Sequence, residues 1–259
     1  MRLIASNLAY SFDGINTLWK NVNLNVGDGE LFSLLGSNGV GKSTMLRCLI
    51  GFFKPFSGDV KLVDDDNSEY NAWNNVKEFT EKIGYVPQLQ DTAYSFQVRD
   101  YVVMGRAPHL GLFSQPQIED YEITDEVLHD MGIYEIRNRS FNCLSGGQQR
   151  QAVIARAIVQ RPKMIIMDEP TNHLDYGNRF RVLQMIEKLL EKGITILLTT
   201  HMPDQALYLG GRAGILTKDG LRIGAAGEVL NEETLQEIYK VKIRLVYVKE
   251  AGRMVCIAS

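Results

Sequence analysis

The stretch Gly36–Thr44, which reads GSNGVGKST, constrains the fold more than any other part of the chain. An apolar run typical of a strand, LFSLL, precedes it, and apolar residues follow at helical spacing from Met45 to Ile50. Glycine, four residues and then Gly-Lys-Ser is the pattern of a phosphate-binding loop between a strand and a helix. Only glycine lets the backbone curl tightly enough to aim successive N–H groups at one ligand. The sequence therefore predicts a triphosphate site on an α/β core.

The polar residues of this stretch predict how the triphosphate is held. A helix that begins near Lys42 adds the positive end of its dipole, and the Lys42 ammonium adds a full charge for the β- and γ-phosphates. The Ser43 hydroxyl is placed to ligate Mg²⁺. The residues expected to hold the nucleotide are Gly36, Ser37, Asn38, Gly39, Gly41, Lys42, Ser43 and Thr44.

A second polar cluster is expected beside the loop. The all-apolar strand Met164–Met167 runs directly into Asp168 and Glu169, at the strand end where ligands bind in open α/β sheets. We expect Asp168 to share the Mg²⁺ with Ser43 and Glu169 to polarise a water molecule. Another buried-type strand ends at His201, which we expect to contact the γ-phosphate.

The segment between the two clusters reads differently. Helical apolar spacing appears near Val98–Gly105 and Ile118–Met131, with prolines between them, which favours a mostly helical insertion. Leu144–Gln148, which reads LSGGQ, then leads into a helix that continues through Ile158. Serine and glycine before a helix N-terminus suit a phosphate, so the chain carries a second anion-binding helix start.

The two ends of the chain complete the expected elements. Residues 2–26 read as an antiparallel β unit in which either Tyr10 or Phe12 could stack on a nucleotide base or pack in the sheet. Further expected elements are strands at Asp59–Val63, Ile83–Val86, Ile194–Thr200 and around Ile215 and Arg222, helices at Arg179–Lys192 and at Glu232–Tyr239 capped by Asn231, and a hairpin turning near Ala251-Gly252.

Composition narrows the partners. The 259 residues include 28 Lys and Arg against 31 Asp and Glu, so no global positive field favours nucleic acid. Three widely separated cysteines read as free thiols in a reducing compartment. The apolar stretch at the N-terminus is too short for a signal peptide, because polar residues follow it too early. No apolar run approaches the roughly 20 residues that cross a bilayer. For work at a membrane, a partner must supply the crossing.

With these motifs in hand, the chain resembles the ATP-binding cassette (ABC) ATPase family over nearly its whole length. The carrier of the resemblance is LSGGQ placed after the phosphate-binding loop and just before MIIMDEP. It implies an α/β fold with a P-loop NTPase core and a mostly parallel sheet, an N-terminal antiparallel β subdomain and an inserted α-helical subdomain. The whole chain, 1–259, is then one cassette, with residues 1–88 and 150–259 as the core and β subdomain and 89–149 as the helical subdomain.

The resemblance also implies roles for single residues, with ATP and Mg²⁺ as cofactors. Gln88 matches the Q-loop glutamine, which is implied to act in catalysis and as a Mg²⁺ ligand. Asp168 matches the Walker B aspartate, Glu169 the catalytic glutamate and His201 the switch histidine. Leu174-Asp175 falls in the D-loop. Phe12 matches the aromatic position that stacks on adenine, although a register shift to Tyr10 stays open. The signature residues implied to contact nucleotide are Ser145, Gly146, Gly147 and Gln148.

The implied assembly is a head-to-tail dimer, in which the signature segment of one copy completes the ATP site of the other. Val98–Pro116 and the tail GEVLNEETLQEIYKVKI resemble ATPases of importers for iron-siderophore, haem and vitamin B12, with a related molybdate branch. Permease subunits and, indirectly, a substrate-binding protein are then the expected partners, at the cytoplasmic face of the cell membrane. A soluble ABC ATPase without transport and an exporter ATPase are the alternatives; no nucleic acid partner is expected.

Overall fold

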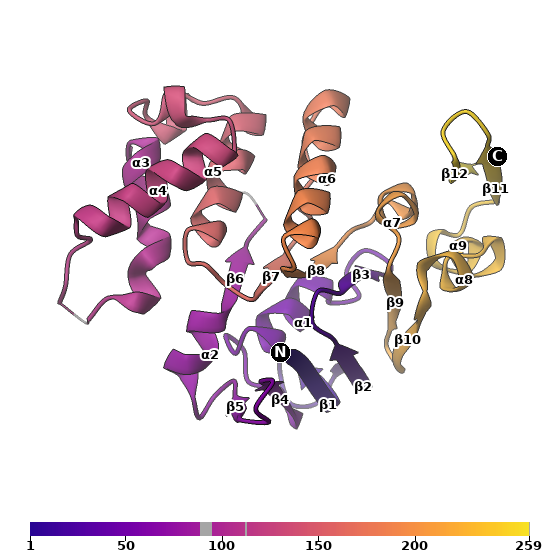
Figure 1. Ribbon diagram of the computed structural model, residues 1–259. Helices are drawn as coiled ribbons and strands as arrows, with labels where there is room; N and C mark the ends of the chain where they lie inside the picture. The colour runs from indigo at the N-terminus through magenta and orange to yellow at the C-terminus, as the bar shows by residue number, and fades with distance from the viewer. Residues whose placement is uncertain (89–94, 112, 259) are drawn as a thin grey trace.

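Two β-sheets, a group of helices and a C-terminal hairpin make up the computed structural model, which describes residues 1–88, 95–111 and 113–258 (Figure 1). The strands are β1 (Arg2–Ser11), β2 (Thr17–Val26), β3 (Leu31–Leu35), β4 (Ser57–Val63), β5 (Glu69–Asn71), β6 (Ile83–Val86), β7 (Met164–Met167), β8 (Thr195–Thr199), β9 (Arg212–Thr217), β10 (Gly220–Ala225), β11 (Ile243–Val248) and β12 (Arg253–Ala258). The α-helices are α1 (Lys42–Leu49), α2 (Val76–Lys82), α3 (Val98–Val103), α4 (Ile118–Asp130), α5 (Gly146–Ile158), α6 (Tyr176–Glu191), α7 (Pro203–Leu209), α8 (Ala226–Val229) and α9 (Glu232–Tyr239), with short 3₁₀ turns at Met104–His109, Tyr134–Ile136 and Phe141–Cys143.

The N-terminal sheet is antiparallel, in the order β2-β1-β4-β5. Buried and exposed side chains largely alternate along β1 and β2, because one face of such a sheet packs on the core while the other meets water. The expected antiparallel β unit is therefore present. It extends beyond the sequence prediction, since β4 and β5 join it as well.

The larger sheet has the order β10-β9-β3-β8-β7-β6 and is parallel except for β10, which pairs antiparallel with β9. Every residue of β3, β7 and β8 is buried, as expected for strands covered on both faces. Because these strands are parallel, their carboxyl ends meet at one edge of the sheet. The residues that follow β3, β7 and β8 are thereby brought to the same edge.

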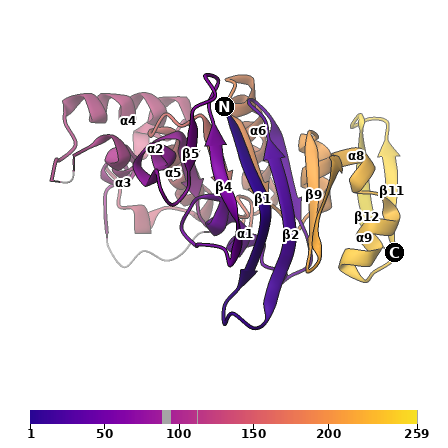
Figure 2. The same cartoon turned by 90° about the horizontal axis from the view of Figure 1, so that it is seen from below.

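Helix α1 lies between the two sheets (Figures 1 and 2). Its buried face, which includes Met45, Leu46 and Leu49, joins one core with Leu3 and Val60 of the antiparallel sheet and with residues of the parallel sheet. Burial of this kind contributes about 25 cal/mol for each Å² of apolar surface. The packing holds the N-terminus of α1, and the loop before it, at a fixed place between the sheets.

Helices α3, α4 and α5 form a group at one side of the molecule, next to α6 (Figure 1). Tyr101 and Phe141 stack within it at 4.3 Å between ring centroids, and a continuous core connects α3 and α5 to β7 and β8. The helices expected near Val98–Gly105 and Ile118–Met131 are both present. The start of the expected helical subdomain, residues 89–94, lies outside the described residues, as does residue 112.

The C-terminal third contains the helices and strands expected from the sequence, with some shifted boundaries, and two further helices, α7 and α8. Helix α9 spans Glu232–Tyr239, and its cap Asn231 accepts the backbone N–H of Thr234 at 2.9 Å. Helix α6 begins at Tyr176 instead of Arg179, because the Asp175 carboxylate accepts the N–H of Asn178 and caps the helix three residues earlier. In the part of the chain that the structure describes, no helix has both the length and the hydropathy of a membrane span.

Candidate nucleotide-binding site

The loop before α1 has an open helix N-terminus. Its N-cap, Gly41, adopts the left-handed conformation (φ +98°), and no side chain caps the helix. The first N–H groups of α1 therefore remain available to an outside acceptor. A Cβ atom at Gly41 would lie 2.5 Å from Leu18 Cδ2, and one at Gly36 would lie 2.8 Å from the Leu216 carbonyl oxygen. The glycines are thus required by close contacts as well as by backbone conformation.

Lys42 folds over this loop. Its ammonium donates to the carbonyl oxygens of Gly36 at 3.0 Å and Ser37 at 3.3 Å, and the residue is only 7% exposed. Burial lowers the pKa of Lys42, while the nearby charges of Glu169 and Asp168 act in the opposite direction. A cation is thus held inside the loop, where an anion would find it with little hydration to displace.

Asp168 follows β7 and is 2% exposed. Its Oδ1 accepts the hydroxyl of Thr199, the last residue of β8, at 2.7 Å. The Thr199 hydroxyl also accepts the backbone N–H of Glu169 at 2.9 Å. The Asp168 carboxylate is therefore held in a fixed orientation at the strand end, close enough to Lys42 for its charge to raise the pKa of that ammonium. A hard cation such as Mg²⁺ prefers carboxylate oxygens as ligands, and the site therefore fits it.

The backbone conformation of Glu169 is unusual, and two side chains contact its carboxylate. It adopts a positive φ of 44°, which is uncommon outside glycine and concentrates at functional sites. Its Oε2 accepts the side-chain amide of Asn172 at 2.8 Å and lies 3.4 Å from Nδ1 of His201. The structure thus brings Asp168, Glu169 and His201 together at the edge where β7 and β8 end. The two carboxylates lie close enough to Lys42 to act on its pKa.

Gln88 follows β6 at the same sheet edge and is partly exposed. The carbonyl oxygen of the preceding Pro87 accepts Nη1 of Arg150 at 2.9 Å. Arg150 lies on α5 and is completely buried, and its Nε and Nη2 have no partner among the described residues. Burial lowers the pKa of Arg150 to about 10. Helix α5 is therefore tied directly to the segment that carries Gln88.

The two candidate base-stacking aromatics differ in exposure. Tyr10 is 9% exposed and contacts the rings of Phe12, Trp19 and Phe53 at centroid distances of 5.1, 5.7 and 5.9 Å. Phe12 is 71% exposed, and its ring meets Tyr10 edge-on. Only Phe12 therefore presents a free ring face on the surface, while Tyr10 serves as its support.

The segment LSGGQ forms the N-terminus of α5 and lies apart from the loop before α1 (Figure 1). Ser145 caps the helix by accepting the N–H of Gln148, whose side chain accepts the N–H of Ser145 in return. A Cβ atom at Gly147 would lie 2.5 Å from the side chain of Asn178 on α6, so a larger residue there would displace that side chain. Ser145, Gln148, Asn178 and Arg181 line a pocket of about 440 Å³ that includes no residue of the phosphate-loop segment.

Several residues that shape the site were not found from the sequence. Two of them contact acidic residues: Thr199 contacts Asp168, and Asn172 contacts Glu169. The other two contact backbone carbonyls: Arg150 that of Pro87, and Tyr239 that of His201. A polar residue at the end of a buried strand was a usable signal for Thr199, since its neighbour strand ends at Asp168. Tyr239 gave no signal, because a tyrosine at the end of an amphipathic helix is an ordinary core residue.

The comparisons with known proteins agree with this geometry. The family model described as ABC transporter matches residues 19–172, which is more than half of the chain. The molybdate import ATP-binding protein MolC of Haemophilus influenzae is 31% identical over 92% of this chain and 87% of its own length. The ferric enterobactin transport ATP-binding protein FepC of Escherichia coli is 31% identical over 92% of this chain and 88% of its own length.

A solved structure is similar along almost the entire chain. It is an inward-facing transporter described as of the metal-chelate type, 29% identical, with a TM-score of 0.86 over 99% of this chain and 97% of that one. The similarity covers both sheets, the helical group and the C-terminal hairpin, so the cassette fold expected from the sequence is confirmed. The chain is an ATP-binding ATPase that belongs to the ABC transporter family.

Proposed function

We propose that the chain is the ATP-hydrolysing subunit of an importer and that it works as a head-to-tail dimer beneath a permease. The observation that carries the proposal is the separation of two anion-binding helix starts. The loop before α1 offers a buried cation and open N–H groups, and the LSGGQ helix start lies elsewhere on the same chain. One copy thus provides two halves of different sites.

Within one site, the loop segment Gly36–Thr44 holds the phosphates of ATP, and Lys42 leaves its carbonyl partners to meet the β- and γ-phosphates. Ser43, Asp168 and Gln88 would hold Mg²⁺, which when bound would neutralise negative charge on the phosphates. Glu169 accepts the proton of the attacking water, and His201 contacts the γ-phosphate. The exposed ring of Phe12 stacks on adenine. The burial of Tyr10 supports this assignment, because a buried ring cannot present its face to the base.

A second copy completes the site. Ser145, Gly146, Gly147 and Gln148 of one copy face the γ-phosphate held by the other, so two ATP molecules lie between the subunits. Arg181 beside Ser145 adds a positive charge to this surface. Hydrolysis to ADP and phosphate removes contacts across the interface and adds repulsion, which opens the dimer.

A groove of about 370 Å³ suits a permease segment. It lies between β6, which leads to Gln88, and the helical group, and its lining includes Tyr85, Met104, Arg156 and Gln160. Arg156 lies on α5, so the helix that begins at LSGGQ lines this groove directly. Movement of the dimer therefore reaches a partner docked there, and the chain works at the cytoplasmic face of the membrane by that contact. Residues 1–88 and 150–259 act as one unit and 89–149 as the other.

We infer the cargo class from the relatives. Their names and that of the similar structure refer to molybdate, ferric enterobactin and metal chelates. A metal chelate such as an iron-siderophore, haem or a corrinoid, or a related oxyanion, is the cargo class of this importer. Selection of the cargo belongs to the permease and to a substrate-binding protein, because the ATPase subunit stays outside the translocation path.

Uptake by cells that carry the gene tests the proposal. Deletion should abolish uptake of one labelled metal chelate or of molybdate, and the wild-type gene should restore it. Glu169→Gln should be produced at the same level and fail to restore it. The tagged protein should also co-purify with a polytopic membrane protein in mild detergent. Unchanged uptake of iron-siderophore, haem, corrinoid and molybdate after deletion would contradict the importer role.

A further inference from the structure

A residue of the last helix contacts the histidine that follows β8. The hydroxyl of Tyr239, on α9, donates to the backbone carbonyl oxygen of His201 at 3.0 Å. The two residues are 38 positions apart in the sequence. Ile238 and Lys240, on either side of Tyr239, also line a pocket with Ser37, Asn38 and Gly39 of the loop before α1. The contact therefore connects the C-terminal part of the chain to the catalytic edge of the sheet.

The Tyr239 hydroxyl is a dependable donor. Its ring packs against a core to which β3, α7, β9, α8, α9 and β11 contribute, and which includes Leu35, Ala206 and Ile215. Burial raises the pKa of Tyr239 to about 12, with smaller contributions from Cys256 and from Glu169. The hydroxyl stays protonated at neutral pH, so it remains able to donate to the His201 carbonyl.

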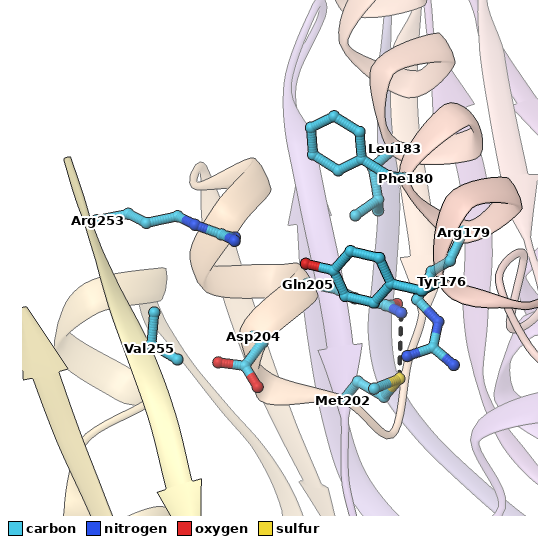
Figure 3. A pocket seen from close by; sticks show the side chains of 9 residues that line it. All are labelled: Tyr176, Arg179, Phe180, Leu183, Met202, Asp204, Gln205, Arg253 and Val255. Atoms are coloured by element: carbon cyan, nitrogen blue, oxygen red, sulfur yellow. Dashed lines mark hydrogen bonds between the residues drawn. The ribbon is translucent and has the colours of Figure 1, made fainter. Parts of the chain in front are cut away.

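A cavity borders the other side of this segment. Met202, Asp204 and Gln205 line a cavity of about 230 Å³ between α6, α7 and β12 (Figure 3). Figure 3 shows Phe180 and Leu183 across the cavity and a hydrogen bond from Gln205 to the Met202 sulfur. A cavity removes contacts from the side chains that border it. The position of the segment therefore depends on directed hydrogen bonds.

Those bonds come from both ends of the turn. Thr200 and Thr171 donate their hydroxyls to Oε1 of Gln205, at 2.9 and 2.8 Å, which fixes the residues before and after His201. The backbone of His201 itself is held through its carbonyl by Tyr239. The N–H of the same peptide unit, from Met202, donates to Thr200 Oγ1 at 3.0 Å, so the two bonds together fix the peptide plane after His201.

We propose that Tyr239 is a positioning residue for catalysis, which acts by holding the His201 backbone so that Nδ1 stays beside Glu169. The distance of 3.4 Å between Nδ1 of His201 and Oε2 of Glu169 is what the contact preserves. The inference rests on the proposed role of His201 at the γ-phosphate. It adds a function for the C-terminal helix, which becomes part of the catalytic apparatus.

Tyr239→Phe tests the proposal, because it keeps the ring and removes only the donor. We expect kcat for ATP hydrolysis to fall about 3- to 10-fold, the worth of one neutral hydrogen bond. The KM for ATP should stay within about twofold, since the described hydrogen bonds of Lys42 go to Gly36 and Ser37 and that of the Tyr239 hydroxyl goes to His201. The matched control is Tyr208→Phe, which removes a hydroxyl that donates to Glu187 Oε2 at 2.9 Å, away from the site. It should leave kcat unchanged.

A double substitution separates positioning from a general loss of stability. In a His201→Ala background, Tyr239→Phe should cause no further decrease of the single-turnover rate, because the group it positions is absent. A further decrease there equal to that in the wild-type background would overturn the proposal. The proposal would also be overturned if His201→Ala impairs hydrolysis but Tyr239→Phe and Tyr208→Phe, each made in the wild-type protein, have equal kcat values. Full activity of His201→Ala would instead overturn the proposed role of the histidine itself.

Discussion

The hydroxyl of Thr199 lies 2.7 Å from Oδ1 of Asp168, so the last residue of one buried strand fixes the carboxylate that follows its neighbour. The same hydroxyl accepts the N–H of Glu169, which adopts a left-handed backbone conformation. A single small side chain therefore orients both acidic residues. The strand order, with β8 between β3 and β7, is what places Thr199 within reach of both.

Thr199→Val should impair catalysis, although valine and threonine have nearly the same size and shape. Valine keeps the shape but leaves buried Asp168 without a donor, which costs about 1 to 3 kcal/mol of stability. Because Glu169 also loses the acceptor for its N–H, we expect kcat to fall about 10-fold or more. Steady-state ATPase kinetics and a denaturation curve measure the two effects.

Thr195→Val is the matched control in the same strand. Thr195 is fully buried and accepts the N–H of Gly29 at 2.9 Å at the opposite end of β8. Its substitution should reduce stability to a similar extent and leave kcat within about twofold. Equal losses of kcat in both variants would mean that strand stability, and not the Asp168 contact, determines the rate.

Glu169→Gln should bind ATP and hydrolyse it slowly. The amide is isosteric and keeps a contact for Asn172, but it accepts no proton, so the rate should fall by roughly 10² to 10⁴, the usual worth of a general base. ATP should accumulate between two copies, and light scattering should report a dimer after ATP is added. Near-normal turnover would refute the assignment of Glu169, and a monomer at high protein concentration would refute the shared site.

Lys42→Ala should weaken nucleotide binding directly. The ammonium is buried among loop carbonyls with its pKa lowered, and phosphate contacts replace the carbonyls when ATP binds. Loss of a charged hydrogen bond of about 1.5 to 3 kcal/mol corresponds to an affinity about 10- to 150-fold lower. Calorimetry measures the affinity for ATP. Lys188→Ala, at an exposed position of α6, is the control for the loss of one positive charge. Equal affinities in the two variants would contradict the role of Lys42.

Much of the fold followed from the sequence because its signals are local. Two apolar strands, one followed by glycine and one by acidic residues, placed β3, β7 and the edge of the sheet, and Asn231 placed the start of α9. The order of the strands was not predicted, since it depends on contacts between distant segments. The start of α6 was placed too late because the capping carboxylate of Asp175 lies before the apolar face begins.

The site was harder to predict where a residue acts through packing. Arg150 reads as one polar residue of the LSGGQ helix, yet it is fully buried and reaches Pro87 across 63 positions. Tyr239 reads as a core aromatic, yet its hydroxyl contacts the histidine that follows β8. Only the three-dimensional structure reveals such partners, because both pairings bring together segments that belong to different parts of the chain.

Cysteine chemistry offers a test of the surface that carries LSGGQ. Cys143 is exposed and immediately precedes Leu144, whereas Cys48 is buried in the core below the loop. Burial raises the pKa of the Cys48 thiol to about 12 and also raises that of Cys256. Only the thiolate reacts. At pH 7.5, N-ethylmaleimide should therefore modify Cys143 first, with one addition by mass spectrometry.

That modification should inhibit ATP hydrolysis, because the added group projects from the surface that must meet a second copy across the nucleotide. Cys143→Ser should hydrolyse ATP normally and resist the reagent. In Glu169→Gln, ATP should slow the modification of Cys143, since the ATP-bound dimer covers this surface, whereas ADP should not. A rate of Cys143 modification that is independent of ATP in this variant would mean that the LSGGQ surface stays exposed, and the second copy would then contribute nothing to the site.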